Sequence, residues 1–342
     1  MNIVGVQDND VRRRLGCNPQ TGRRASENED EYQKPAVQSG HGMRISMRKT
    51  FVNPGTHVRL MVLALLVGLA SRTSGQILNS EASVVVGHYH LNVTSVEEHK
   101  KFWVDTLGGI ATTFGPGKIQ AVKFPGVLLF LGEQPPAGPT RGTTFDHIGF
   151  AVPDVQKMAA QAVARGYQLT AGREPGPGQT VSPPTAGNYG RFAYLLGPDG
   201  VKVELVTNSE ANAPPITHHH VHFVNKQYVE MQQWYMKALN ATLRPGQTDF
   251  FIGADLPGVG YMLNFFLWEP NENLAGTNGR AVDHIGFEVR NLEEFCRQLE
   301  AKGIKLTAPY RKTPELNNIG TAKITDPWGT SIELTEGLHQ VR

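Results

Sequence analysis

One pentapeptide occurs twice in this chain and carries residues suited to metal chemistry. Asp-His-Ile-Gly-Phe stands at 146–150 and again at 283–287. After each copy come a helical pattern, a Gly/Pro turn and a strand pattern ending in Glu-Leu, at Glu204 and at Glu333. Imidazole nitrogens and carboxylate oxygens are ligands of divalent metals. A His and a Glu repeated in equivalent places therefore indicate a duplicated metal site, since internal repeats report architecture.

A structural interpretation competes with this one for each residue taken alone. An Asp-His pair that opens a buried strand can form a local hydrogen bond, and a Glu near a domain end is normally solvated. The joint recurrence of His and Glu in both halves favours ligation. A buried Glu without a cation would cost on the order of several kcal/mol.

The elements that must position these residues recur as four units of strand, helix, strand, strand, strand. In the second unit the predicted strands cover 147–152, 167–170, 191–196 and 201–206. Its helix, 155–165, begins after a capping Asp154 and ends at Gly166. The fourth unit repeats this order, and weaker copies begin at 84 and 216. The pattern predicts an α+β fold built from four β-α-β-β-β units.

The four units group along the chain into two predicted domains, 84–207 and 216–338. The segment between them, 208–215, reads Asn-Ser-Glu-Ala-Asn-Ala-Pro-Pro and is the predicted linker. The chain of 342 residues is long enough for roughly two domains with sizeable cores. The first strands of units one and three match each other, so that His88 corresponds to His220 and His90 to His222.

An export signal is predicted ahead of these domains. An uncharged apolar run, 61–70, follows several Arg and Lys residues and precedes a small, polar run, the order of a signal peptide over 47–75. A buried core helix is the competing interpretation, but no amphipathic period surrounds the run. It is too short to span a bilayer, which takes about 20 residues, so no stable membrane anchor is expected. Residues 1–46 are predicted to be disordered or untranslated, and the protein to be periplasmic or secreted.

Composition excludes several classes of protein. Lys and Arg number 33 against 31 Asp and Glu, so the net charge of +2 gives no bias toward nucleic acid. The cysteines, Cys17 and Cys296, cannot build a thiolate zinc site or a redox pair. The expected partner is a small-molecule substrate, and the oligomeric state, a homo-oligomer included, stays open.

The sequence resembles the vicinal oxygen chelate superfamily, which includes glyoxalase I, bleomycin-resistance proteins and extradiol ring-cleaving dioxygenases. The resemblance covers about residues 84–338. It rests on Gly-His-Tyr-His-Leu-Asn-Val at 87–93, on the two pentapeptides and on the two Gly/Asp-Pro-x-Gly…Glu-Leu endings. It implies two tandem half-open barrels, each made of two units around a metal. Members pair unit one with unit two or with unit four, so the pairing stays open.

This resemblance implies metal ligands on the first strand of each unit and on the last strand of a domain. Grouped by consecutive domain, the matching residues are His88, His147 and Glu204, and then His220, His284 and Glu333. Two His and one carboxylate with open positions are the pattern of non-heme Fe(II) oxygenases. A divalent metal is therefore expected, with Fe²⁺ favoured over Mn²⁺, Zn²⁺ or Ni²⁺.

A fourth ligand of the glyoxalase I kind would lie within 127–131 or 262–266. Neither segment contains a carboxylate, and Glu133 and Glu269 come just past their ends. The missing carboxylate favours the dioxygenase branch over the glyoxalase branch.

Three further residues are predicted to be catalytic. His90 and His222 lie two positions beyond a proposed ligand, on the same face of the strand and about 6.6 Å further along, a distance that argues against joint chelation with that ligand. They are candidates for acid/base work or for hydrogen bonds to the ligands, and a register error of two would make them ligands themselves. Tyr194 is a candidate for holding an anionic or phenolic oxygen. Arg191 and Lys323 are candidates for the same role, and the competing interpretation is that each is a solvated residue on a strand.

The predicted function is that of an exported divalent-metal enzyme whose substrate binds through two neighbouring oxygens. Its most specific form is extradiol-type cleavage of a catechol-like diol. One alternative is a glyoxalase-type lyase or isomerase acting on a 2-oxo compound. Another, which is not an enzyme, is a protein of the bleomycin-resistance type that sequesters a planar aromatic compound.

Overall fold

The structure, a computed structural model, describes residues 82–338 apart from 175, 179–190, 211 and 249–250. The predicted extension over 1–46 and signal peptide over 47–75 lie outside the described residues. Within the described part of the chain, no helix is both long and apolar enough to cross a membrane.

The predicted order of strand, helix, strand, strand, strand is confirmed in all four units. Unit one contains β1 (Val84–Val93), α1 (Val96–Lys100), the π-helical turn η2 (Lys101–Thr106), β2 (Ile110–Phe114), β3 (Ile119–Phe124) and β4 (Val127–Glu133). Unit two contains β5 (Phe145–Val152), α2 (Val155–Ala164), β6 (Gln168–Thr170), β7 (Phe192–Leu196), the 3-10 turn η3 (Pro198–Gly200) and β8 (Lys202–Thr207).

Units three and four repeat this order, although the second strand has two residues in unit three and eight in unit four. Unit three contains β9 (Thr217–Asn225), α3 (Tyr228–Leu239), β10 (Thr242–Leu243), β11 (Phe251–Leu256) and β12 (Gly260–Leu267). Unit four contains β13 (Val282–Val289), α4 (Leu292–Ala301), β14 (Leu306–Thr313), the 3-10 turn η4 (Pro314–Leu316), β15 (Ile319–Thr325) and β16 (Ser331–Glu336). The fold is therefore α+β, as predicted.

Local sequence explains where α2 begins and where both α2 and α4 end. The Asp154 carboxylate accepts a hydrogen bond from the Lys157 backbone N–H at 2.9 Å and caps α2. Gly166 and Gly303 follow α2 and α4 with φ of 92° and 78°, a left-handed conformation that glycine adopts without strain.

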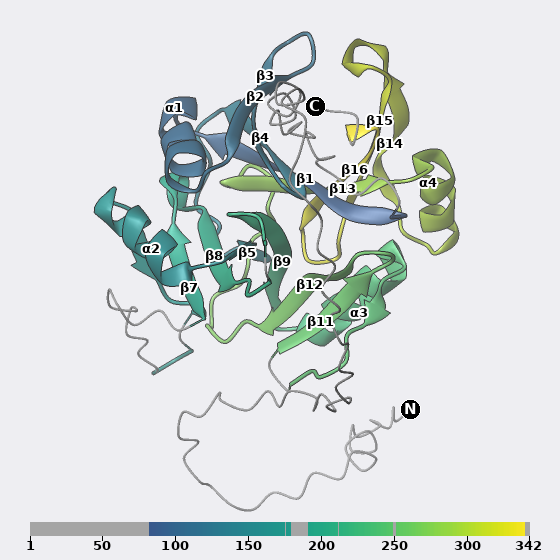
Figure 1. Cartoon of the computed structure of the whole chain (residues 1–342). Helices are drawn as coiled ribbons and strands as arrows, with labels where there is room; N and C mark the ends of the chain where they lie inside the picture. Colours follow the sequence, from purple (N-terminus) through teal and green to yellow (C-terminus); the bar gives the residue numbers. More distant parts are fainter. Residues whose placement is uncertain (1–81, 175, 179–190, 211, 249–250, 339–342) are drawn as a thin grey trace, which may run out of the picture. The chain divides into compact units, whose positions relative to one another are not determined.

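The strands form two eight-stranded mixed sheets, and the pairing of units, which the sequence left open, is one with four and two with three. One sheet has the order β14-β15-β16-β13-β1-β4-β3-β2 and contains units four and one; we call it the outer-unit sheet. The other has the order β10-β11-β12-β9-β5-β8-β7-β6 and contains units three and two; we call it the inner-unit sheet. Figure 1 shows β1 next to β13, and β5 next to β9. Each predicted domain therefore contributes half of each sheet.

Units one and two, and likewise units three and four, lie in different sheets and contact each other partly through helices and turns. In units one and two, His99 Nδ1 accepts a hydrogen bond from Trp103 Nε1 at 3.1 Å, and His99 Nε2 lies 3.0 Å from Asp199 in turn η3. In units three and four, Tyr235 on α3 donates to Asp326 in the corresponding turn at 3.0 Å. One hydrophobic core cluster contains buried residues from all four units. This packing places the strands that carry the repeated pentapeptide, β5 and β13, at the centres of the two sheets.

Candidate metal centres

Three donor atoms converge in the inner-unit sheet, each from a different strand. His147 Nε2 on β5 and His220 Nε2 on β9 each lie 2.9 Å from Glu204 Oε2 on β8. The two nitrogens are 3.2 Å apart. Neighbouring ligands of a metal bound at about 2.1 Å are roughly 3.0 Å from each other. The three atoms therefore fit one face of a divalent metal's coordination shell, which we call the inner-unit centre.

The His147 ring is oriented by a buried ion pair on its other side. His147 Nδ1 lies 2.6 Å from Asp146 Oδ2, and that oxygen also accepts from Lys202 Nζ at 2.9 Å. Burial opposes ionisation of Asp146, but Lys202 and His147 outweigh it and hold its pKa below the ordinary value. An ionised Asp146 accepts the proton of His147 Nδ1, which leaves the lone pair of His147 Nε2 pointing into the centre.

The other two donors of this centre are also held from outside. The Tyr194 hydroxyl donates to Glu204 Oε1 at 2.7 Å. His220 Nδ1 lies 2.8 Å from His219 Nδ1, so that one ring donates and the other accepts. With His220 as the donor, its Nε2 also presents a lone pair to Glu204. Three acceptors then face one another without a donor, an arrangement that needs a cation.

A proton is the competing occupant of the inner-unit centre. Burial lowers the pKa of His147, but hydrogen bonds to Asp146 and Glu204 outweigh it and raise that pKa above its ordinary value. Burial opposes ionisation of Glu204, yet hydrogen bonds from His147 and His220 hold its pKa well below the ordinary value. The centre therefore carries an anionic Glu204 that either a metal or a protonated His147 neutralises.

A second group of donors lies in the outer-unit sheet. His88 Nε2 on β1 and His284 Nε2 on β13 lie 3.1 Å and 3.5 Å from Glu333 Oε2 on β16. Asp283 orients His284 as Asp146 orients His147, with 2.6 Å between Asp283 Oδ1 and His284 Nδ1. Lys323 Nζ lies 3.6 Å from Glu333 Oε1. We call this group the outer-unit centre.

The structure groups the six predicted ligands across the two predicted domains. The two groups that can each hold one metal ion are His147, Glu204, His220 and His222, and His88, His284 and Glu333. The groups cross the predicted domains because β5 pairs with β9 and β1 pairs with β13. These His/Glu groups support a divalent metal ion.

The comparison with protein families agrees with this geometry. The model of the Glyoxalase/Bleomycin resistance protein/Dioxygenase superfamily matches residues 85–205 and 217–334. The chain belongs to this superfamily. Comparison with curated proteins finds no match.

Two solved structures share the fold. Glyoxalase I from Zea mays superposes with a TM-score of 0.56 at 19% identity, covering 76% of this chain and 95% of that chain. A putative dioxygenase from Bacillus subtilis subsp. subtilis str. 168 gives a TM-score of 0.54 at 13% identity, covering 75% and 85%. The fold is thus shared with a glyoxalase I and with a putative dioxygenase.

The two histidines predicted to transfer protons occupy different environments. His222 belongs to the inner-unit group, with its Nδ1 3.1 Å from His147 Nε2. His90 is partly exposed, lies outside the outer-unit group and stacks on the His284 ring at 4.8 Å. Burial, followed by the neighbouring charges of His284 and His88, lowers the pKa of His90 to about 4. His90 is therefore a neutral base at pH 7.

The residues predicted to contact substrate, Tyr194, Lys323 and Arg191, also lie in different environments. Tyr194 and Lys323 occupy equivalent positions, because each is paired in register with the glutamate of its centre. Tyr194 is hydrogen-bonded to Glu204, whereas the Lys323 side chain is 41% exposed. Arg191 is exposed and precedes β7.

The glycine of the repeated pentapeptide is a functional residue that sequence reasoning missed. A Cβ atom on Gly149 would overlap the ring of His220, and one on Gly286 would overlap the ring of His88. Both overlaps arise because each glycine is paired in register with that histidine. The recurrence of glycine in both copies was the available signal for this role.

The position of the missing fourth carboxylate also differs between the centres. Asn264 on β12 is paired with His222, and Phe130 on β4 is paired with His90. Asn264 is buried and accepts a hydrogen bond from Arg244 Nη1 at 2.7 Å. Phe130 places its ring 5.2 Å from the ring of His88. The residue paired with His222 is therefore polar, whereas the residue paired with His90 is aromatic.

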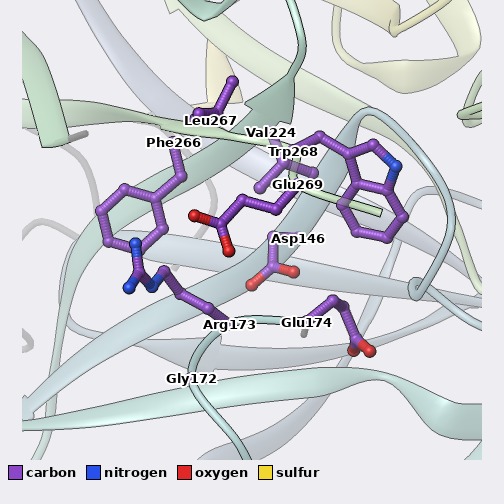
Figure 2. Close-up of a pocket in the computed structure, with 9 residues that line it drawn as sticks. All are labelled: Asp146, Gly172, Arg173, Glu174, Val224, Phe266, Leu267, Trp268 and Glu269. Carbon is purple, nitrogen blue, oxygen red and sulfur yellow. The ribbon is translucent and has the colours of Figure 1, made fainter. Parts of the chain in front are cut away.

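A small pocket with a cavity volume of about 10 Å³ lies beside the inner-unit centre. It is lined by Asp146, Gly172, Arg173, Glu174, Val224, Phe266, Leu267, Trp268 and Glu269. Figure 2 shows the carboxylates of Asp146 and Glu269 and the ring of Phe266 around this space. The Phe266 ring packs 4.0 Å from the ring of His222. None of the four donors lines the pocket, so Asp146 and Phe266 lie between it and the centre.

Proposed function

We propose that this protein is a divalent-metal-dependent enzyme whose substrate binds at the outer-unit centre through two neighbouring oxygens. The observation that carries the proposal is the group His88, His284 and Glu333, two imidazoles and one carboxylate from three adjacent strands. The Glu333 side chain is 20% exposed, against 7% for Glu204, so this face is the more open one. When bound there, Fe²⁺ would supply open positions for a chelating diol and for O₂.

In its most specific form, the proposed reaction is extradiol-type cleavage of a catechol-like diol, with both atoms of O₂ entering the ring-opened product. The neutral His90 ring stacks on His284, at a place where it can accept a proton from a diol hydroxyl. Phe130 lies beside His88 and offers an apolar surface to an aromatic ring. The residues of this chain thus bind the ring, orient the ligands and move the proton.

The test uses untagged full-length protein reconstituted with Fe²⁺ under anaerobic conditions and then given O₂ and a panel of catechols. We expect O₂ uptake together with the absorbance of a ring-cleaved product. His284→Ala should abolish both, and His147→Ala, the matched change in the other centre, should retain them per folded molecule. Failure of the wild-type protein to take up any metal would contradict the enzyme proposal and favour a protein that sequesters a planar aromatic compound.

The same face suits a second candidate, a lyase or isomerase acting on a 2-oxo compound. The observation that favours it is Lys323, whose ammonium lies 3.6 Å from Glu333 Oε1. A positive charge at this place would stabilise negative charge that develops on an enolate oxygen. Product formation without O₂ consumption, lost in Lys323→Met, would select this candidate over ring cleavage.

We also propose that the protein is exported to the periplasm or secreted, on the support of the apolar run at 61–70 and its flanks. The test is N-terminal mass spectrometry of the protein from a fractionated bacterial host. A new N-terminus close to Gln76 in the periplasmic or medium fraction is the expected result. An uncleaved chain in the cytoplasmic fraction would contradict it.

A further inference from the structure

The inner-unit centre has one donor residue more than the outer-unit centre. The reaction proposed for the outer-unit centre does not use the inner-unit centre. We propose that the inner-unit centre binds a second divalent metal as a closed four-donor site, with His222 Nδ1 as the fourth ligand, and that this metal stabilises the fold instead of binding substrate. The inference concerns His147, Glu204, His220 and His222, and it stands independently of the reaction proposed for the outer-unit centre.

The positions of the donor atoms are the first support. His147 Nε2, Glu204 Oε2, His220 Nε2 and a ring nitrogen of His222 all lie within 4.8 Å of one another. The His222 atom nearest to another donor is Nδ1, 3.1 Å from His147 Nε2. Its Nε2 is buried without a hydrogen-bond partner, on a ring packed against Phe266. His222 is thus oriented with Nδ1 toward the shared point.

The closure of this centre is the second support. The four residues are each at most 5% exposed, and the neighbouring pocket is lined by none of them. Structural zinc sites are closed by four protein ligands, whereas catalytic sites keep one position open for water or substrate. The inner-unit centre matches the closed kind, and the outer-unit centre, with three donors and a partly exposed Glu333, matches the open kind.

The contrast with His90 is the third support. His90 and His222 are each paired in register with the pentapeptide histidine of the neighbouring unit, His284 and His147. The His90 ring is stacked on the His284 ring with 15° between their planes, so the nitrogens of the two rings lie in two nearly parallel planes. The His222 ring is tilted by 51° to that of His147 and only 4.4 Å from it. This tilt brings Nδ1 toward the donors, which the parallel stack does not do for His90.

The test compares His222→Phe with His90→Phe, a matched pair that keeps an aromatic ring and removes its nitrogens. Each metal-depleted protein is loaded with Co²⁺, and metal content, chelator competition and the visible spectrum are recorded. For the wild-type protein we expect two Co²⁺ per chain, one of them with the intense absorption of a tetrahedral site. His222→Phe should lose that absorption and at least tenfold in affinity at one site, while His90→Phe should keep both.

Two results would overturn the proposal: a tetrahedral absorption and affinity unchanged in His222→Phe, or an equal loss in His90→Phe. If His222→Phe does not fold, a second measurement on a variant that keeps His222 still tests the proposal. In His284→Ala, which removes the outer-unit ligand set, X-ray absorption at the bound metal should count three imidazoles. A count of two would exclude His222 as a ligand.

The structural role has its own readout. Removal of metal should lower the melting temperature of His284→Ala as much as that of the wild-type protein, and should have no effect on His147→Ala. A decrease that depends on His284 instead would place the stabilising metal in the outer-unit sheet and contradict this part of the proposal. A protein that binds both metals and cleaves no catechol would leave this inference intact and overturn the proposed reaction alone.

Discussion

In the inner-unit centre every ligand of the His147, Glu204 and His220 face has an outer partner, whereas in the outer-unit centre His88 Nδ1 is buried without one. The carboxylate behind the pentapeptide histidine differs too. Asp146 is paired with the buried ammonium of Lys202, while Asp283 accepts from the Gly279 backbone and from Asn92. Both centres contain the same pentapeptide, so the difference between them arises from residues outside it.

That difference teaches how one repeated motif can serve two purposes. A ligand set whose outer partners are buried and charged is rigid and closed, which suits a metal that holds strands together. A ligand set beside an exposed Lys323 and an apolar Phe130, with a partly exposed Glu333, suits a metal that exchanges ligands. The surroundings of the ligands, more than the ligands, decide which centre can turn over a substrate.

The largest difference between the two sheets is expected in the stability that each loses in acid. Burial and neighbouring charges lower the folded-state pKa of His218 and His219 to about 3 in the inner-unit sheet, and that of His90 to about 4 in the outer-unit sheet. Their unfolded pKa is about 6.5, so below that pH the unfolded chain binds protons that the folded chain does not. Stability of metal-free protein should therefore fall, by several kcal/mol in order of magnitude, as pH decreases from about 6.5 toward these values.

Two histidines oppose this trend without reversing it. The folded-state pKa of His147 and of His284 is raised by hydrogen bonds to carboxylates, despite burial. Their contribution is complete below pH about 6.5 and is lost as pH rises through the folded value. Hydrogen exchange at pH 7 and pH 5 measures the outcome for each sheet. Stronger loss of protection in β9 than in β1 is expected; equal loss would remove this distinction between the sheets.

Removal of the oriented carboxylates should give the next largest effect, and an unequal one. Asp146→Asn leaves the Lys202 ammonium buried without its partner, which costs about 3–5 kcal/mol of stability. Asp283→Asn leaves no buried cation unpaired, and its cost should be near 1 kcal/mol, that of one hydrogen bond. Both should lower metal affinity at their own centre by about 10–100-fold. Urea unfolding checks the first pair of values, and a similar stability loss in both variants would contradict the reasoning.

Sequence reasoning predicted the fold, which is confirmed, and it named six ligand candidates from a repeated Asp-His and a repeated Glu at matched positions. It could not choose the partners of β5, because that strand is buried along its whole length and an apolar strand pairs equally well with either neighbour. The choice depends on contacts between helices and turns far apart in sequence, such as His99 with Asp199.

Sequence reasoning also could not distinguish His90 from His222, which stand in the same His-x-His context. Their difference is one of ring tilt, set by neighbours on other strands. Lys202 was missed because a lysine in a terminal strand is normally solvated, whereas here it is 3% exposed. Such roles depend on burial, which the order of residues alone does not give.

The pentapeptide glycines allow each centre to be broken separately. Gly149→Ala should displace the His220 ring and Gly286→Ala the His88 ring, at an overpacking cost of about 1–3 kcal/mol. Each variant should lose more than about 100-fold in metal affinity at its own centre, the upper effect of losing an outer partner, and little at the other. Metal titration of both variants tests this. Loss at both centres in either variant would show that the two centres are coupled through the hydrophobic core that the four units share.

The smallest expected effects should have opposite signs. Tyr194→Phe removes a hydrogen bond to a buried carboxylate, at a cost of about 1 kcal/mol, and should weaken metal binding at the inner-unit centre because Glu204 is less firmly held. Lys323→Met removes an exposed ion pair worth about 0–1 kcal/mol. It also removes a positive charge close to Glu333, so metal binding at the outer-unit centre should become slightly tighter. Chelator competition on the two variants measures both changes, and a weaker outer-unit centre in Lys323→Met would show that Lys323 positions Glu333 as Tyr194 positions Glu204.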